Sequence, residues 1–112
     1  MASQKDYDLV RFLTSATKAG NVQWEASAIE GAYFASFKGK YNVSMESSRD
    51  RDGDMLYSMI LRNAPDNREM LRLSEYQGLV VELFEVAQRA ALSVDAAIDD
   101  IMDIPPDDLS KV

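Results

Sequence analysis

Residues 33–45 read YFASFKGKYNVSM, and this stretch decides the class of fold. Large apolar side chains recur at every second position on both sides of Lys38-Gly39-Lys40, which is the spacing of a strand that buries one face. A short connection that contains glycine suits the tight turn between two antiparallel strands. The stretch therefore predicts a β-hairpin.

Further strand signals lie on both sides of this hairpin. Upstream, Val22 and Trp24 alternate with polar neighbours. Downstream, a polar loop precedes the apolar run at residues 55–62, and a turn signal at residues 63–67 precedes a last apolar segment at residues 70–73. We expect four strands in one antiparallel sheet.

A helix is predicted before the strands, over about residues 4–18. Ser3 and Asp6 have the spacing of a capping box, in which each residue satisfies a free N–H group of the other. Gly20 stands where a left-handed C-terminal cap belongs. The apolar positions at helical spacing are Leu9, Val10, Phe12, Leu13 and Ala16.

Two helices are predicted after the strands. The first is opened by Ser74 or Glu75 and ends near Ala91, and the second is opened by Ser93. Runs of strands followed by runs of helices favour an α+β fold, here a four-stranded antiparallel sheet with the N-terminal helix and two C-terminal helices mainly on one face. Residues 1–104 form a single domain in this prediction. The segment 105–112 follows as a flexible acidic tail.

Length and composition limit the class of protein. A chain of 112 residues with 46% apolar and 28% charged residues is ordinary for one globular domain. No stretch approaches the ~20 consecutive apolar residues of a membrane span, and the first residues lack the order of a signal peptide. The absence of cysteine removes disulfides and thiolate chemistry. We expect a cytoplasmic protein that does not enter the membrane.

Charge is distributed unevenly along the chain. The last forty residues carry two Lys or Arg against nine Asp or Glu, a difference that alone equals the net charge of −7. Direct binding to nucleic acid is not expected, because phosphates would be repelled there and no compact basic stripe lies elsewhere. The acidity fits solvated helix faces. It also fits a surface formed by Asp99, Asp100 and Asp103 that meets the basic surface of a partner protein.

Catalytic residue types are poorly represented. Without histidine the chain lacks the commonest general base near neutral pH and the commonest transition-metal ligand, and without cysteine it lacks the most reactive nucleophile. No phosphate-binding glycine loop and no nucleophile elbow are present in the sequence. We therefore predict a binding protein rather than an enzyme, with no cofactor.

Two groups of aspartates offer the oxygen ligands that hard cations prefer. A calcium loop of the EF-hand type starting at Asp50 would need Gly and Glu where the chain has Met55 and Leu61. Asp99 and Asp103 lie one helical turn apart, whereas a metal site normally takes ligands from several elements. We expect no metal at either group, and interpret them as a charged hairpin loop and a solvated acidic face.

Both faces of the strand predicted at residues 55–62 are apolar. Helices that cover one side of the sheet would leave the other side exposed, and exposed apolar surface marks interfaces. Tyr57 and Met59 lie on one face of this strand, and methionine adapts to irregular surfaces. We expect these two residues to bind a partner or a second copy of the chain.

A-T-x-x-G occurs at residues 16–20, followed by Trp24-Glu25, and LFEVAQRAAL occurs at residues 83–92. Together these segments resemble the beginning and the closing helices of a group of small uncharacterised bacterial proteins, over most of residues 9–101. The resemblance implies a helix–sheet–helix layout and carries no activity with it.

Three hypotheses for function follow. The first is a small acidic regulator or inhibitor that binds a protein, such as an immunity, anti-defence or antitoxin-like protein of a bacterium or phage. The second is a structural module, a homodimer closed through the sheet face of Tyr57 and Met59. The third is a small enzyme or ligand carrier that uses carboxylates or aromatic side chains.

Overall fold

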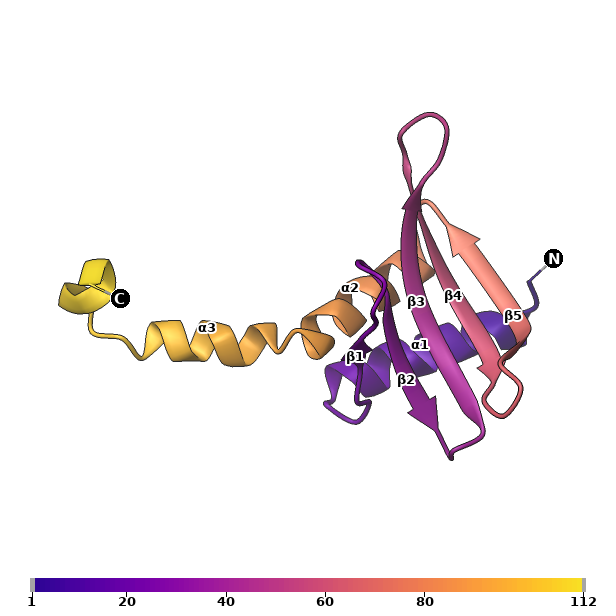
Figure 1. Ribbon diagram of the computed structural model, residues 1–112, viewed down its shortest axis with the longest axis horizontal. Helices are drawn as coiled ribbons and strands as arrows, with labels where there is room; N and C mark the ends of the chain where they lie inside the picture. Colours follow the sequence, from indigo (N-terminus) through magenta and orange to yellow (C-terminus); the bar gives the residue numbers. More distant parts are fainter. Residues whose placement is uncertain (1, 112) are drawn as a thin grey trace.

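The computed structural model describes residues 2–111, which form a five-stranded sheet preceded by one helix and followed by two (Figure 1). In chain order the elements are α1 (Gln4–Lys18), β1 (Glu25–Ala26), β2 (Tyr33–Phe37), β3 (Tyr41–Arg49), β4 (Met55–Asn63), β5 (Arg68–Glu75), α2 (Leu79–Ala91), α3 (Val94–Met102) and the 3₁₀ helix η1 (Pro106–Lys111). The predicted α+β class is confirmed. The tail predicted at residues 105–112 contains η1, and Val112 lies outside the described residues.

Helix α1 begins and ends as its sequence predicts. The Ser3 hydroxyl accepts the N–H of Asp6 at 3.2 Å, and the Asp6 carboxylate accepts the N–H of Ser3 at 2.8 Å. This is the reciprocal capping box. Beyond the last turn, Gly20 takes a φ of +80°, which a residue with a Cβ adopts only at a cost.

The sheet is a meander in which each strand pairs antiparallel with its neighbours in sequence. The hairpin predicted from residues 33–45 is present, with Phe37 opposite Tyr41. The N–H of Lys40 donates to the Phe37 carbonyl at 3.0 Å and closes its turn. Lys38 and Gly39 both take positive φ there, as the favoured tight hairpin turns require.

The sheet has five strands rather than the four predicted. The additional strand, β1, contains two residues and pairs Glu25 with Phe34 of β2. The strand signal of Val22 and Trp24 ends directly before β1, and two residues are too few to extend its alternation, so it does not locate this strand. The buried Trp24 next to it fixes the segment to α1, because its Nε1 donates to the Thr17 hydroxyl at 2.9 Å.

Helix α2 covers the sheet and contacts all five strands as well as α1. It starts later than predicted, because Ser74 and Glu75 end β5 instead of opening the helix. The Glu75 carboxylate then accepts the N–H of Val80 at 2.8 Å, which satisfies one of the free donors in the first turn of α2. The core lies between the helices and the sheet, and its central fully buried side chains are Val10, Met45, Met59, Val80, Leu83 and Ala87.

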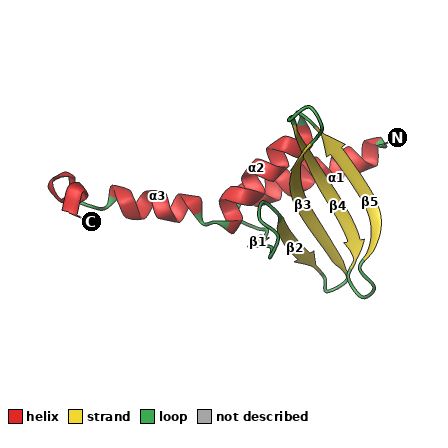
Figure 2. Cartoon of the chain, turned by 45° about the horizontal axis from the view of Figure 1, so that its top comes forward, coloured by secondary structure: helices red, strands yellow, loops and turns green. Residues whose placement is uncertain are grey.

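Helix α3 does not lie on the sheet. Within residues 2–111 the one element it contacts is α2, and Figure 2 shows α3 and η1 extending away from the rest of the fold. The connection from α2 is Leu92-Ser93, in which Ser93 takes a left-handed φ of +53°. The predicted placement of both C-terminal helices on one face of the sheet therefore holds for α2 and not for α3.

None of the helices described within residues 2–111 combines the length and apolar character needed to cross a bilayer.

Candidate functional site

Tyr57 and Met59 lie on the face of β4 that α2 covers. Met59 is completely buried in the core, and the half-buried Tyr57 ring packs edge to face against Phe84 of α2, with ring centres 4.9 Å apart. The expectation that this face is exposed is wrong. Strand alternation puts Tyr57 and Met59 on the same side of the sheet, and that side packs against the helices. Their side chains belong to the core.

The opposite face of the sheet carries a polar network rather than an apolar platform. Ser58 and Ser74, cross-strand partners on β4 and β5, share a hydrogen bond of 2.7 Å between their hydroxyls. Arg62 of β4 donates to the Ser44 hydroxyl of β3 at 3.3 Å. These contacts satisfy polar groups within the sheet, and Ile60, the apolar residue between Ser58 and Arg62 on this face of β4, is fully buried.

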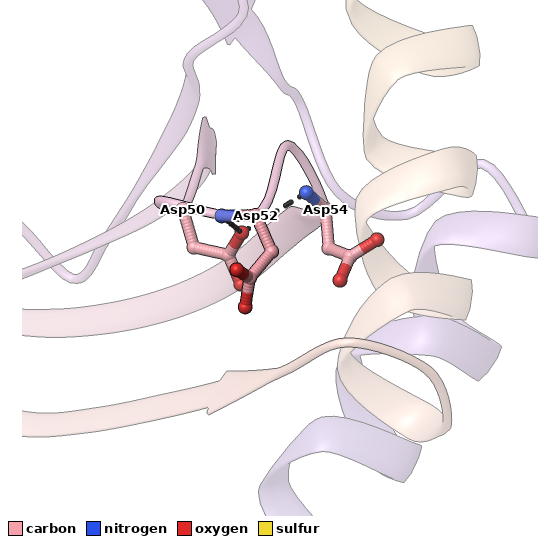
Figure 3. Close-up of side chains that lie close together, drawn as sticks. All are labelled: Asp50, Asp52 and Asp54. Carbon is pink, nitrogen blue, oxygen red and sulfur yellow. Dashed lines mark hydrogen bonds between the residues drawn. The ribbon is translucent and has the colours of Figure 1, made fainter.

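Asp50, Asp52 and Asp54 come together in the β3–β4 loop, where one carboxylate oxygen of each lies within 4.8 Å of the others (Figure 3). Asp50 Oδ1 accepts the N–H groups of Asp52 at 2.9 Å and Asp54 at 3.0 Å. The Tyr76 hydroxyl also donates to this carboxylate and, with those N–H groups, holds the pKa of Asp50 below its ordinary value. The group has oxygen ligands for a hard cation, but its arrangement is that of a hydrogen-bonded hairpin loop.

Asp95, Asp99 and Asp100 lie on α3, Asp103 caps its C-terminal end, and all four are exposed. A helical turn of 3.6 residues puts Asp99, Asp103 and Asp100, in that order, around one side of the helix within about 100° of arc. None of the side chains of α3 is buried. Asp95, at its start, accepts a hydrogen bond from Arg89 of α2.

The remaining side of α3 is an apolar stripe. Ile98, Ile101 and Met102 follow the i, i+3, i+4 spacing that puts side chains on one face of a helix. Their side chains are 41%, 58% and 76% exposed. Three large apolar side chains on one short helix, none of them covered by the described fold, form an unpartnered surface that we call the α3 stripe.

A second apolar surface lies between the middle of α1 and residues of strands β2 to β5. It is a hollow of about 390 Å³, which we call the α1 groove, and it is lined by Leu9, Phe12, Leu13, Phe37, Tyr41, Val43, Leu61 and Met70. Phe12 is 68% exposed and Met70 50% exposed at its rim. Phe12 shares the helical spacing of the apolar positions of α1 but lies outside its buried face, which consists of Val10, Leu13, Thr14 and Thr17.

Basic side chains border the α1 groove. Lys38 and Lys40 flank the lining residues Phe37 and Tyr41 in the β2–β3 turn, and both are exposed. Among the described residues neither lysine belongs to an ion pair. Arg68, at the start of β5, opens the strand that supplies Met70. This end of the sheet therefore presents three cations beside an apolar surface.

The carboxylates at the same end of the sheet are already hydrogen-bonded. Glu69 binds Arg72 through three contacts, the shortest 2.8 Å, and this guanidinium lowers the pKa of Glu69. Asp66 accepts the N–H of Arg68 and the amide of Asn63, and these contacts lower its pKa. Both carboxylates stay charged near neutral pH and are held within their own strands and turn.

No protein-family model matches this chain, and no curated protein sequence or solved structure matches it either. The functional interpretation therefore depends on the surfaces of the molecule itself.

Proposed function

We propose that the protein is a small regulator or inhibitor that binds another protein through α3, and that it is not an enzyme. The observation that carries this proposal is the α3 stripe, which the fold leaves uncovered while it buries the apolar face of α2. Exposed apolar surface costs solubility, and in soluble proteins it commonly marks an interaction site. Its spacing is the one by which an amphipathic helix binds a hydrophobic groove.

The acidic side of the same helix favours a partner with a basic surface. Asp99, Asp100 and Asp103 lie on the other side of the helix from the α3 stripe, with Asp99 nearest to it, so a protein that encloses the helix brings its own charges close to them. Opposite charges speed association and exclude wrong partners, and salt screens them. Immunity, anti-defence and antitoxin-like proteins work by such binding, and a bacterial or phage origin is consistent with the resemblance of residues 16–25 and 83–92.

The test is site-specific photocrosslinking in the native host. A photoreactive amino acid replaces Ile101, and the control carries it at Asp52 in the β3–β4 loop, at the far end of the sheet from the groove. We expect one dominant crosslinked protein from position 101 and none from position 52. Reversing Asp99, Asp100 and Asp103 to Lys should lower the yield, and high salt should lower it too. The same products from both positions would argue against α3 as the binding element.

A homo-oligomeric module is the second candidate. Tyr57 and Met59 no longer support it, because α2 covers them. The α1 groove supports it instead, since the chain offers an apolar helix and an apolar receiving surface at once.

A further inference from the structure

We infer that the partner of α3 is a second copy of this chain, and that the α3 stripe of one copy occupies the α1 groove of the other. The inference rests on the second candidate function, the homo-oligomeric module, and adds which surface of the second copy receives α3. Three features of the structure support it: apolar complementarity, charge complementarity and the direction in which α3 leaves the fold.

Apolar complementarity is the first feature. The α1 groove is lined by aliphatic and aromatic side chains, and Tyr41 carries the sole side-chain hydroxyl among them. Sites for small molecules normally add several placed polar groups that fix the orientation of the ligand. A surface without them fits aliphatic side chains, which need no hydrogen bonds. Ile98, Ile101 and Met102 supply three such side chains from one helix face.

Charge complementarity is the second feature. Lys38, Lys40 and Arg68 are close along the chain to Phe37, Tyr41 and Met70 of the groove, and the α3 stripe is flanked by Asp99, with Asp100 on the far side of the helix. A helix laid in the groove with its stripe inward carries its flanking carboxylate toward the rim. Residues 94–111, which contain α3 and η1, hold six Asp and one Lys, so this segment brings net negative charge to a basic rim.

The direction of α3 is the third feature, and it favours a second copy over the same chain. The connection Leu92-Ser93 is two residues long, and α3 continues outward from the end of α2 (Figure 2). The hydrogen bond from Arg89 to Asp95 links the two helices in this arrangement. In this arrangement α3 is held away from α1 and from the strands that line the groove of its own chain.

Each copy has one stripe and one groove, so two copies can exchange helices around a two-fold axis. If the geometry does not close, the same contact joins copies head to tail. A single nine-residue helix is small against the ~800 Å² per partner of a standard interface. We therefore expect a reversible dimer that dissociates on dilution, with both exchanged contacts needed for its stability.

Because the chain contains no cysteine, disulfide crosslinking between introduced cysteines tests the contact directly, without interference from native thiols. Ile101→Cys and Phe12→Cys are prepared as separate full-length chains with tags of different size, mixed and oxidised. We expect a disulfide-linked heterodimer, and little when Ile101→Cys is mixed with Asp52→Cys. The double variant Phe12→Cys/Ile101→Cys, oxidised at high dilution, tests whether α3 binds the α1 groove of its own chain. A disulfide within one chain would overturn the inference.

Oligomeric state gives the second test. Sedimentation equilibrium of the wild-type chain should show a mass that rises with concentration toward two chains. Ile101→Asp on α3 and Met70→Asp at the groove should each weaken association at least tenfold. Both side chains are at least half exposed, at 58% and 50%, so the fold should survive, as circular dichroism can verify. A wild-type mass of one chain at all concentrations would overturn the inference.

Charge-reversal variants test whether Lys38 and Lys40 at the rim of the groove meet the carboxylates of α3 from the second copy. Asp99→Lys/Asp100→Lys should weaken association, Lys38→Glu/Lys40→Glu should do the same, and combining the four changes should restore it. Asp52→Lys in the β3–β4 loop is the control, since this exposed side chain lies at the end of the sheet away from the groove and its reversal should not change association. Failure of the combined variant to recover would remove this rim from the contact. If the chain is monomeric while Ile101 still crosslinks a different protein in the host, the inference fails and the proposed function stands.

Discussion

The pKa of Asp50 depends on the hydrogen bonds that this carboxylate accepts in the β3–β4 loop. Asp50 is hydrogen-bonded by the Tyr76 hydroxyl and by two N–H groups of its own loop, and its folded-state pKa lies below its ordinary value. A depressed pKa means that the charged form stabilises the fold at pH values above the unfolded pKa. That contribution is lost as the pH falls through the folded pKa.

We expect Tyr76→Phe to raise the pKa of Asp50 toward its ordinary value, because the largest cause of the shift is the hydroxyl of Tyr76. The amide signals of Asp52 and Asp54, whose N–H groups donate to Asp50, follow this titration by NMR. Glu69 serves as the control, since its pKa is held down by Arg72 and should not move. An unchanged midpoint for the loop amides would show that Tyr76 does not bind Asp50.

The buried hydroxyl of Thr17 gives a second prediction at the residue scale. It accepts the Trp24 Nε1–H at 2.9 Å and donates to the Leu13 carbonyl at 2.6 Å. Thr17→Val would leave the buried indole N–H unpaired, which costs about 1–3 kcal/mol of unfolding free energy. Thr14→Val is the matched control, because the Thr14 hydroxyl is also buried and donates to the Val10 carbonyl of its own helix at 2.8 Å.

Urea unfolding, followed by the fluorescence of the single tryptophan, measures both variants. Equal losses of stability in the two threonine variants would contradict a specific role for the contact between Thr17 and Trp24.

Among the elements, those with a strong local pattern were predictable from sequence. The β2–β3 hairpin has regular alternation on both sides of a glycine turn, and α1 has a complete capping box. The two-residue β1 has no pattern of its own and exists because Trp24 is anchored to α1. The periodicity of residues 55–62 predicts which side chains share a face of β4. Whether the face of Tyr57 is covered depends on the position of α2, which periodicity does not predict.

Helices α2 and α3 differ in their coupling to the fold, and one substitution in each tests this. Ala87 of α2 is completely buried, so Ala87→Gly should cost at least about 1 kcal/mol of unfolding free energy. Ala97 of α3 is exposed, so Ala97→Gly should leave the urea midpoint unchanged while lowering helicity. The comparison is made in solutions dilute enough to keep the chain monomeric. Equal shifts of the midpoint would mean that α3 is coupled to the core.

For the whole molecule, the candidate site could be predicted in part. The acidity of Asp99, Asp100 and Asp103 is visible in the sequence, and so is the apolar spacing of α3. The α1 groove is not, because its lining comes from α1 and four strands that only the folded chain brings together. Phe12 in particular looks like a core residue until the burial of Thr14 and Thr17 shows that α1 is rotated away from it.

The extended position of α3 determines the size of the monomer in solution. The Cα radius of gyration is 16.4 Å, whereas a compact domain of 112 residues has about 13 Å by the usual scaling with length. Small-angle X-ray scattering from a dilute solution should give the larger value. A value near 13 Å would show that α3 folds against its own body and would contradict its outward direction.

The two-residue connection between α2 and α3 also makes the chain sensitive to cleavage. Leu92 and Ser93 are exposed, and the helix that follows them contributes no buried side chain. Exposed connections of this kind are where proteases cut folded proteins. A single cut at this connection would leave the sheet and both covering helices intact while releasing the apolar and acidic arm. One proteolytic event would therefore end binding permanently without unfolding the domain.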